Sequence, residues 1–147
     1  MNLTLAHVGT KLSGKEGYEQ LTALYLRRCE PYVRCQSEAF RTEEVFLEWL
    51  DKQQRRSPAS AVLLDSRGKE MTSEGFASWL GGQRDAGTRH VVFAIGPADG
   101  WSEATRRRAS LLLSLGRMTW THEICRALLL EQIYRAFSIL RNIPYHK

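Results

Sequence analysis

The sequence predicts an α/β fold built on a mainly parallel β-sheet. Two short apolar runs, at residues 61–65 and 89–95, lie between turn-forming residues and show no alternation with polar side chains. Such runs are typical of strands that are buried on both faces of a sheet. Strands that alternate with helical patterns of roughly ten to fifteen residues favour a parallel sheet covered by helices.

The first half of the chain supplies two strands and two helices. Residues 3–8 alternate apolar and polar side chains and end at Gly9, which predicts a strand followed by a loop through Gly14. Apolar residues at helical spacing then predict a helix over 18–28, which Pro31 ends. The remaining expected elements are a strand over 32–40 and a helix that Thr42 caps and that ends near the polar run 52–57.

The second half repeats this alternation. The strand at 61–65 leads to a helix capped by Thr72 or Ser73, and the Gly81-Gly82 pair is expected to end that helix. After the strand at 89–95, a glycine-rich turn at 96–100 leads to a helix that Ser102 caps and that runs to about residue 113. The final helix starts at its cap Thr121 and runs to about residue 137.

The final helix is apolar on more than one face. Its large apolar residues are spread too widely around the helix for one sheet to cover, which predicts that a second chain covers the rest. They are Ile124, Leu128, Leu129, Ile133 and Tyr134. Glu131 precedes Arg135 by four residues, the favourable order for a helical ion pair. Both a solvated ion pair and a functional arginine fit this spacing.

Positive charge is concentrated in the last third of the chain. Residues 1–100 hold 13 basic and 13 acidic side chains, whereas 101–147 hold 8 basic and 3 acidic ones, which gives the net charge of +5. The chain ends in Tyr145-His146-Lys147, a combination that suits stacking on a base and binding a phosphate. This pattern favours a nucleic acid partner over a membrane, although a solvated tail and a solvated run at 106–108 remain alternatives.

Length and composition indicate one soluble domain spanning residues 1–147. Cys29, Cys35 and Cys125 form no CxxC pair and have no histidine at ligand spacing, so we expect reduced packing residues and no metal site. The N-terminus lacks the features of a signal peptide, and no apolar run approaches the length of a membrane span. We therefore expect a cytoplasmic protein without a membrane partner.

One candidate pocket follows from the predicted sheet. Ligands of parallel α/β sheets bind beyond the carboxyl ends of the strands, which here brings together 64–65, 96–100 and 115–121. The sequence has no nucleophile elbow, Walker loop or GxGxxG fingerprint, so hydrolase, P-loop and Rossmann dehydrogenase interpretations lose their main support. His122 and His146 bracket the final helix and are better site candidates than His7 and His90, which flank strands.

An ordered set of motifs resembles the RlmH family across the whole chain. The matching motifs are Val8-Gly9-Thr10-Lys11, Leu64-Asp65-x-x-Gly68-Lys69-x-x-Thr72-Ser73-x-x-Phe76-Ala77, Phe93-x-Ile95-Gly96-x-x-x-Gly100, Ser114-Leu115-x-x-Met118-Thr119-x-x-His122, Leu130-Glu131-Gln132-x-Tyr134-Arg135-Ala136-Phe137 and Pro144-Tyr145-His146-Lys147. No single motif is specific, but the ordered set is. RlmH proteins belong to the SPOUT class and methylate N3 of a pseudouridine in the 23S ribosomal RNA of the large subunit.

The resemblance implies a trefoil-knotted α/β fold, a homodimer, and S-adenosylmethionine as the methyl donor bound in the knot. Chain physics alone would argue against a knot, because threaded topologies are rare. The resemblance also implies that the C-terminal tail of one subunit completes the site of the other. The substrate would be ribosomal RNA within the ribosome or its large subunit.

The resemblance carries over to individual residues. The expected cofactor-binding residues are Leu64, Gly96, Leu115, Gly116, Arg117, Met118, Thr119 and Trp120. We expect His146 and Lys147 near the base, Tyr145 to position it, and Arg135 and His122 to contact RNA or shape the site. These groups would align the base nitrogen with the electrophilic methyl group and favour loss of the N3 proton.

Two rival functions fit the same sequence. One is a SPOUT methyltransferase that acts on another RNA nucleotide. The other is a knotted RNA-binding module without a cofactor, and Pro97 favours it because family members usually carry a glycine there. Proline removes an amide donor and restricts the conformation of Gly96.

Overall fold

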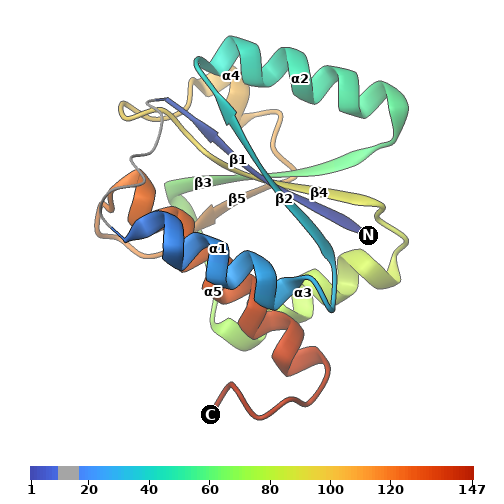
Figure 1. Cartoon of the computed structure of the whole chain (residues 1–147). Helices are drawn as coiled ribbons and strands as arrows, with labels where there is room; N and C mark the ends of the chain where they lie inside the picture. Colours follow the sequence, from blue (N-terminus) through green and yellow to red (C-terminus); the bar gives the residue numbers. More distant parts are fainter. Residues whose placement is uncertain (10–16) are drawn as a thin grey trace.

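A five-stranded, fully parallel sheet forms the centre of the molecule in the computed structural model, which describes residues 1–9 and 17–147 (Figure 1). The strand order is β2-β1-β4-β3-β5. The strands are β1 (Asn2–Val8), β2 (Arg34–Phe40), β3 (Ala59–Glu70), β4 (His90–Ile95) and β5 (Leu111–Ser114). Because all strands run in the same direction, their carboxyl ends meet at one edge of the sheet, where loops can gather around a ligand.

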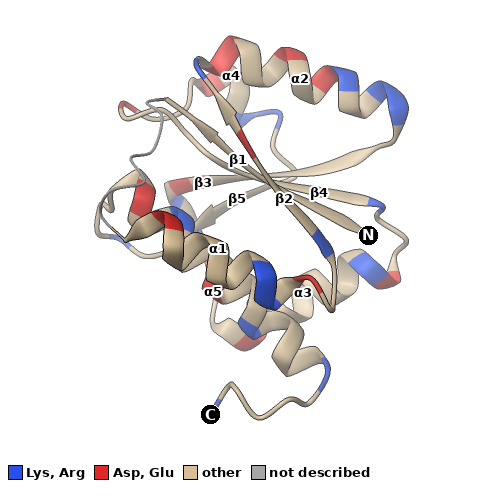
Figure 2. Ribbon diagram, viewed as in Figure 1, with Lys and Arg blue, Asp and Glu red and all other residues tan. Residues whose placement is uncertain are grey.

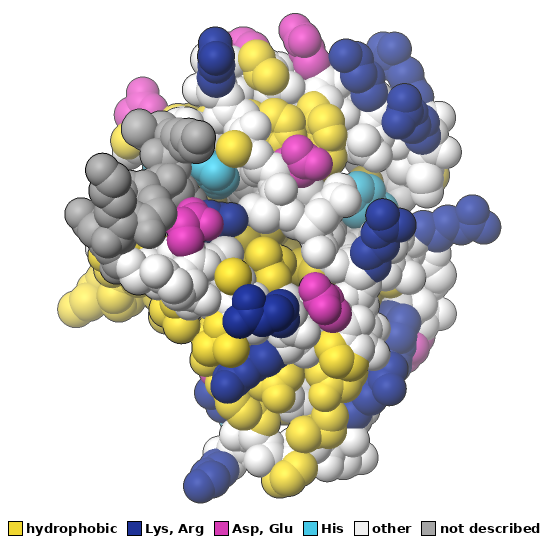
Figure 3. Space-filling model, viewed as in Figure 1, with side chains coloured by type: hydrophobic (Ala, Val, Ile, Leu, Met, Phe, Trp, Pro, Cys, Tyr) yellow, Lys and Arg dark blue, Asp and Glu magenta, His cyan; other side chains and the backbone are white. Residues whose placement is uncertain are grey.

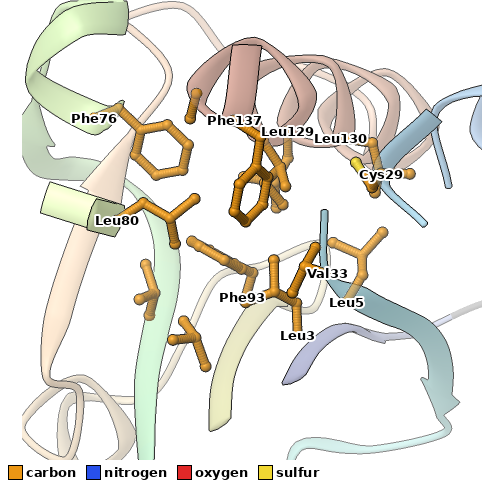
Figure 4. Close-up of a cluster of buried hydrophobic side chains, with 14 of the residues drawn as sticks. Leu3, Leu5, Cys29, Val33, Phe76, Leu80, Phe93, Leu129, Leu130 and Phe137 are labelled. Carbon is orange, nitrogen blue, oxygen red and sulfur yellow. The ribbon is translucent and has the colours of Figure 1, made fainter. Parts of the chain in front are cut away.

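Helices cover both faces of the sheet (Figure 1). One layer holds α1 (Tyr18–Cys29), α3 (Ser73–Asp85) and α5 (His122–Leu140), and the other holds α2 (Glu43–Arg56) and α4 (Glu103–Arg106). Each layer has its own core of buried apolar side chains. In the larger core, Phe76 of α3, Leu129 of α5 and Phe93 of β4 point toward one another (Figure 4). The predicted α/β fold with a parallel sheet is therefore confirmed.

Most predicted elements lie close to the observed ones. The strands predicted at 3–8 and 89–95 are β1 and β4, and the helix predicted at 18–28 is α1. Thr42, Thr72, Ser102 and Thr121 cap their helices through their side-chain oxygens, as expected. The loop predicted to run through Gly14 falls mainly within 10–16, outside the described residues. Local capping and hydrophobic spacing thus placed the starts of these helices correctly.

The helix predicted from Ser102 to about residue 113 is wrong. The helix α4 ends at Arg106, and the leucine-rich segment that follows is the edge strand β5. The backbone amide of Ser110 donates to the carbonyl oxygen of Ala61 at 2.8 Å, which draws the chain into register with β3. A run of leucines suits both helix and buried strand, so pairing with a distant strand decided between them.

Two further boundaries differ from the prediction. Helix α3 continues through Gly81-Gly82 to Asp85, and α5 continues past residue 137 to Leu140. The two differences are linked, because a side chain at Gly81 would come within 2.9 Å of Leu140. Gly81 therefore allows α3 and the end of α5 to pack closely, and it does not end its helix.

The strand β3 is longer than predicted. It begins at Ala59 and extends to Glu70, with a shift of its register against β5 between Leu64 and Lys69. The irregular part lies beside the carboxyl end of β4, where β-bulges often re-aim side chains near functional sites. Among the described residues, no helix combines the length and apolarity that a membrane crossing requires.

Candidate functional site

A cavity of about 430 Å³ lies at the carboxyl end of β4, beside residues 64–67 in the irregular part of β3, and we call it the strand-end cavity. Its walls come from these parts of the two strands, from the turn at 96–101 and from the loop between β5 and α5. The predicted cofactor-binding residues that line it are Leu64, Gly96, Leu115, Gly116, Met118, Thr119 and Trp120. Arg117 is exposed and does not line it. The fold thus gathers three segments that are distant in sequence around one space of the size that small molecules occupy, about 300–1,000 Å³.

Trp101 supports the Gly96 side of the strand-end cavity. Its indole N–H donates to the carbonyl oxygen of Leu64 at 3.0 Å, and its ring packs 5.5 Å from that of Phe46. A Cβ atom at Gly96 would lie 2.8 Å from this indole. Gly96 therefore has no room for a side chain, and its bare backbone leaves the cavity open to a ligand.

Asp65 is held in a fixed position beside the same cavity. The backbone amide of Arg67 donates to its Oδ1 at 2.8 Å, and Nε of Arg106 donates to its Oδ2 at 2.8 Å. Burial by itself raises the pKa of Asp65, but the Arg67 amide and the Arg106 guanidinium more than offset burial, so the pKa lies below its ordinary value. Asp65 is thus a stable carboxylate that orders the irregular part of β3.

Ser114 shapes the wall where β5 meets the following loop. Its side chain is buried, its hydroxyl donates to the carbonyl oxygen of Gly116 at 2.8 Å, and its oxygen accepts from the Gly116 amide at 3.1 Å. Gly116 has φ +128°, a conformation that favours glycine. The chain therefore makes a sharp turn that brings Leu115 and Gly116 against the strand-end cavity.

The C-terminal tail is anchored on α5. Glu131 accepts hydrogen bonds from Arg135 Nη2 at 2.5 Å and from the Tyr145 hydroxyl at 2.9 Å. His146 contacts Arg135 through Nδ1 at 3.2 Å and Glu74 through Nε2 at 2.8 Å. The predicted ion pair of Glu131 and Arg135 is confirmed, and it serves as the anchor of the tail.

Arginines lie against tyrosines around this anchor. The guanidinium of Arg135 is 4.8 Å from the ring centre of Tyr145, and that of Arg28 is 5.2 Å from the ring centre of Tyr25. Figure 3 shows basic and hydrophobic side chains side by side over α1 and the end of α5. Burial, followed by the hydrogen bonds with Tyr25 and Glu131, raises the pKa of Tyr145. Tyr145 therefore stays a neutral hydrogen-bond donor.

The predicted catalytic residues do not all come together within one chain. His122 opens α5 and lines the strand-end cavity, whereas the tail contacts the middle of the same helix. A helix of 19 residues spans roughly 28 Å. Arg135, Tyr145 and His146 form one cluster, Lys147 is exposed beside it, and none of these four lines the cavity with His122.

Three supporting residues were not among the predicted site residues, although Ser114 begins one of the motifs of the RlmH resemblance. Trp101, Arg106 and Ser114 support the cavity through contacts with Leu64, Asp65 and Gly116. The only signal for Trp101 was its place directly after the glycine-rich turn. Arg106 lay within a run that resembled a solvated helix face.

The other histidines and Cys29 belong to the packing, whereas Cys125 lines the strand-end cavity. His7 is buried in β1, where burial followed by the nearby charge of Arg126 lowers its pKa. The Nε2 atom of His90 is hydrogen-bonded to the hydroxyl of Thr4 at 2.9 Å. Burial raises the pKa of the Cys29 thiol to about 12, so this thiol is inert. Within residues 1–9 and 17–147, no group of three His, Cys, Asp or Glu side chains is arranged to hold a metal ion.

Known proteins are similar to this chain in sequence and in fold. The family model described as "Predicted SPOUT methyltransferase" matches residues 1–146. Two relatives are named "Ribosomal RNA large subunit methyltransferase H". The one from Koribacter versatilis is 40% identical and covers 99% of this chain and 98% of its own length. The one from Pelobacter propionicus is 42% identical and covers 99% of each.

A solved structure supports the fold independently. The SpoU methyltransferase AviRb from Streptomyces viridochromogenes, determined in complex with the cofactor AdoMet, aligns with a TM-score of 0.51 at 11% identity. The alignment covers 90% of this chain and 56% of that one. At this identity the likeness concerns the fold alone. Together with the full-length family match, the parallel sheet and the loops at its carboxyl edge show that this chain is a member of the SPOUT methyltransferase family.

Proposed function

We propose that this protein transfers the methyl group of S-adenosylmethionine to N3 of a pseudouridine in the 23S ribosomal RNA of the large subunit. The main support is that seven of the eight cofactor residues expected from the RlmH resemblance line one cavity. Relatives that match over their whole length carry the name of a large-subunit ribosomal RNA methyltransferase. A ribosomal substrate implies that the protein works in the cytoplasm.

The strand-end cavity fits the proposed methyl donor. Gly96 presents bare backbone, and the loop from Leu115 to Trp120, which lines the cavity except at Arg117, would supply groups for the polar parts of the donor. The bound donor supplies an electrophilic methyl group attached to a sulfonium. The protein then has to align N3 of the base with this methyl group and to favour loss of the N3 proton.

The tail residues would favour the proton step, in which N3 gives its proton to solvent water. His146 and Lys147 would lie beside the base, where a positive charge stabilises the anion that forms when N3 loses its proton. Tyr145 would position the base by contact with its ring, because its neutral hydroxyl already donates its proton to Glu131. Arg135 would hold the tail, and His122 would shape the wall of the strand-end cavity.

The proposed active unit is a homodimer in which the tail of one subunit completes the site of the other. Within one chain the tail contacts the middle of α5, away from the strand-end cavity. Leu128 of α5 and the preceding Met118 and Trp120 are exposed large hydrophobic residues, which a partner subunit would cover. We also propose that the segments around this cavity are threaded as the trefoil knot of the SPOUT class.

A methyl-transfer assay tests the function. Labelled S-adenosylmethionine is supplied with 70S ribosomes, large subunits, free 23S RNA or tRNA, and the modified nucleotide is mapped by primer extension and mass spectrometry. We expect methyl transfer to one pseudouridine of the large-subunit RNA. Methylation of tRNA or of a different nucleotide would instead support a SPOUT enzyme with another target.

Calorimetry separates an enzyme from an RNA-binding module. Binding of S-adenosylmethionine should produce heat and raise the melting temperature. The His146→Ala variant should keep this binding and lose methyl transfer. If the wild type gives neither heat nor a thermal shift, the RNA-binding module is favoured, and Pro97 offers the reason. A His146→Ala variant with the wild-type rate would remove this residue from the catalytic group.

A further inference from the structure

A second cavity of about 330 Å³ lies between the start of α3 and the middle of α5, and we call it the helix cavity. The proposed donor site does not account for it. Its apolar walls come from Phe76, Leu128 and Leu129, and its polar groups include Ser73 and Gln132. Apolar walls with a few convergent polar groups are typical of a site for a flat organic ligand.

The helix cavity and the strand-end cavity share one wall. Leu113, Leu115 and Gly116 line both of them. The hydrogen bonds of Ser114 with Gly116 fix this short turn in place. The two cavities therefore meet at this turn. A methyl group and a base placed at their common border would come into the direct contact that transfer requires.

Hydrogen bonds orient the polar groups of the helix cavity. The hydroxyl of Ser73 donates to Oε1 of Gln132 at 2.8 Å, and Nε2 of Gln132 donates to Glu131 at 2.8 Å. Glu131 is itself fixed by Arg135 and Tyr145. A primary amide has two N–H groups and a hydroxyl oxygen has two lone pairs, so one N–H of Gln132 and the oxygen of Ser73 stay available to a ligand.

We propose that the helix cavity receives the target base, with Gln132 binding a carbonyl oxygen next to N3 and Ser73 accepting the N1–H of pseudouridine. This inference rests on the proposed function. Enzymes that modify a base commonly take it out of the stack, hold it between apolar side chains and read its edge by hydrogen bonds. The walls formed by Phe76, Leu128 and Leu129 suit the faces of such a base.

The assignment also explains how one base is chosen over another. In pseudouridine N1 carries a proton, whereas in uridine N1 is bonded to the ribose, so only pseudouridine can donate to Ser73. When N3 loses its proton, the negative charge spreads onto the neighbouring carbonyl oxygens. A hydrogen bond from Gln132 to one of these oxygens therefore becomes stronger as the anion forms. Ser73 sets specificity, and Gln132 assists the reaction.

The test uses Ser73→Ala and Gln132→Met in the full-length protein. Gln20→Met on the exposed surface of α1 serves as the matched control. The substrates are ribosomes from cells that lack this protein, which carry the unmethylated pseudouridine, and ribosomes from cells that also lack the pseudouridine synthase, which carry uridine there. The measured quantities are kcat and KM on each substrate, the calorimetric affinity for S-adenosylmethionine, and the melting temperature.

We expect Gln132→Met to lower kcat/KM on pseudouridine about tenfold, the effect of losing one good hydrogen bond. Ser73→Ala should reduce the ratio of the rates on pseudouridine and uridine about tenfold. Both variants should keep the wild-type affinity for S-adenosylmethionine, and Gln20→Met should match the wild type throughout.

Three results would overturn the assignment. Both variants could keep the wild-type kcat/KM and substrate preference, which would remove the base from this cavity. They could instead weaken S-adenosylmethionine binding, which would show that the cavity holds part of the donor. If the wild type methylates neither substrate, the proposed function fails first and this inference fails with it.

Discussion

At the scale of single residues, Trp101 has two roles in the strand-end cavity. Its N–H satisfies the carbonyl oxygen of Leu64, which lies at the cavity wall, and its ring fills the space below Gly96. Both contacts involve a buried ring that also packs on Phe46. The position of the Gly96 backbone is therefore fixed by a rigid side chain and not by a flexible loop.

A methyl group at Gly96 tests this arrangement. Gly96→Ala would press against the indole of Trp101, which cannot move away because Phe46 lies beside it. We expect the free energy of unfolding to fall by about 1–3 kcal/mol, as for an overpacked core. Affinity for S-adenosylmethionine should fall as well. Urea denaturation and calorimetry measure the two effects, and Gly82→Ala is the control, since a Cβ there meets nothing within 4 Å.

Asp65 should make the free energy of unfolding depend on pH in the acidic range. Its pKa is lowered in the folded protein, so its contribution to the free energy of unfolding is present above the ordinary carboxyl value of about 4. The contribution is lost as the pH falls through the lowered value of the folded state. Asp65→Asn should remove this part of the pH dependence in urea denaturation between pH about 2 and 6, whereas Asp85→Asn at an exposed pair should not.

Residues of this kind are hard to predict from sequence. Motif resemblance named Leu64 and Gly96, but nothing in the local pattern pointed to Trp101 or Arg106. Trp101 is 37 positions from Leu64, and Arg106 is 41 positions from Asp65. Only the folded chain brings these pairs together, because the contacts depend on which strands become neighbours.

At the scale of elements, side-chain caps fix where the helices near the site begin. Thr72 accepts from the amide of Gly75 at 3.0 Å at the start of α3, and Thr121 accepts from the amide of Ile124 at 3.4 Å at the start of α5. Both helices begin next to a cavity wall. Their caps therefore determine where the wall residues lie.

The two caps should differ in strength. Thr72→Ala removes the shorter hydrogen bond and should lower the free energy of unfolding by about 1 kcal/mol, a typical value for a lost cap. Thr121→Ala removes a longer, weaker hydrogen bond, so it should lower the free energy of unfolding by less. Urea denaturation of both variants beside the wild type measures the order, and a larger loss for Thr121→Ala would contradict it.

Elements whose identity depends on distant pairing were the ones predicted wrongly. Caps and hydrophobic spacing located the starts of α2, α3 and α5. The leucines of β5 read as the end of a helix because their strand partner, β3, lies about 50 positions earlier in the sequence, beyond the range of local signals. The glycine pair in α3 was predicted to end the helix, because the sequence does not reveal that Gly81 packs against Leu140.

At the scale of the whole molecule, α5 is the central helix of its layer. It packs on the sheet between α1 and α3, which explains why its apolar residues cover more than one face. Leu128 nevertheless remains 37% exposed. Because α1 and α3 cover much of α5, the apolar surface left for a second chain is smaller than the sequence predicted.

The remaining exposed surface tests the proposed dimer. Leu128→Asp places a charge where the partner subunit would pack, so we expect dissociation to monomers in analytical ultracentrifugation. Methyl transfer is not the measured quantity here, because Leu128 also lines the helix cavity. Val45→Asp on α2 is the matched control, since Val45 is 46% exposed on the opposite face of the sheet. Dimers that persist in Leu128→Asp at micromolar concentration would exclude this face as the interface.

The net positive charge of the last third of the chain does not correspond to a single surface of the folded molecule. Figure 2 shows basic residues on α1, at the end of α2 and near the C-terminus, whereas the sequence placed the whole excess in the last third. Within that third, Arg106, Arg126 and Arg135 are engaged in ion pairs with acidic residues. Net charge along the chain therefore does not locate the surface that would meet RNA.

The strand β2 at one edge of the sheet has a consequence for how copies of the protein behave in concentrated solution. A free edge invites another chain to add a strand and to start aggregation. Here the edge strand carries the polar and charged residues Arg34, Gln36 and Glu38, whose hydrated side chains oppose pairing with another strand. Self-association by sheet extension is thereby disfavoured, and contact between two copies is left to the helical surfaces.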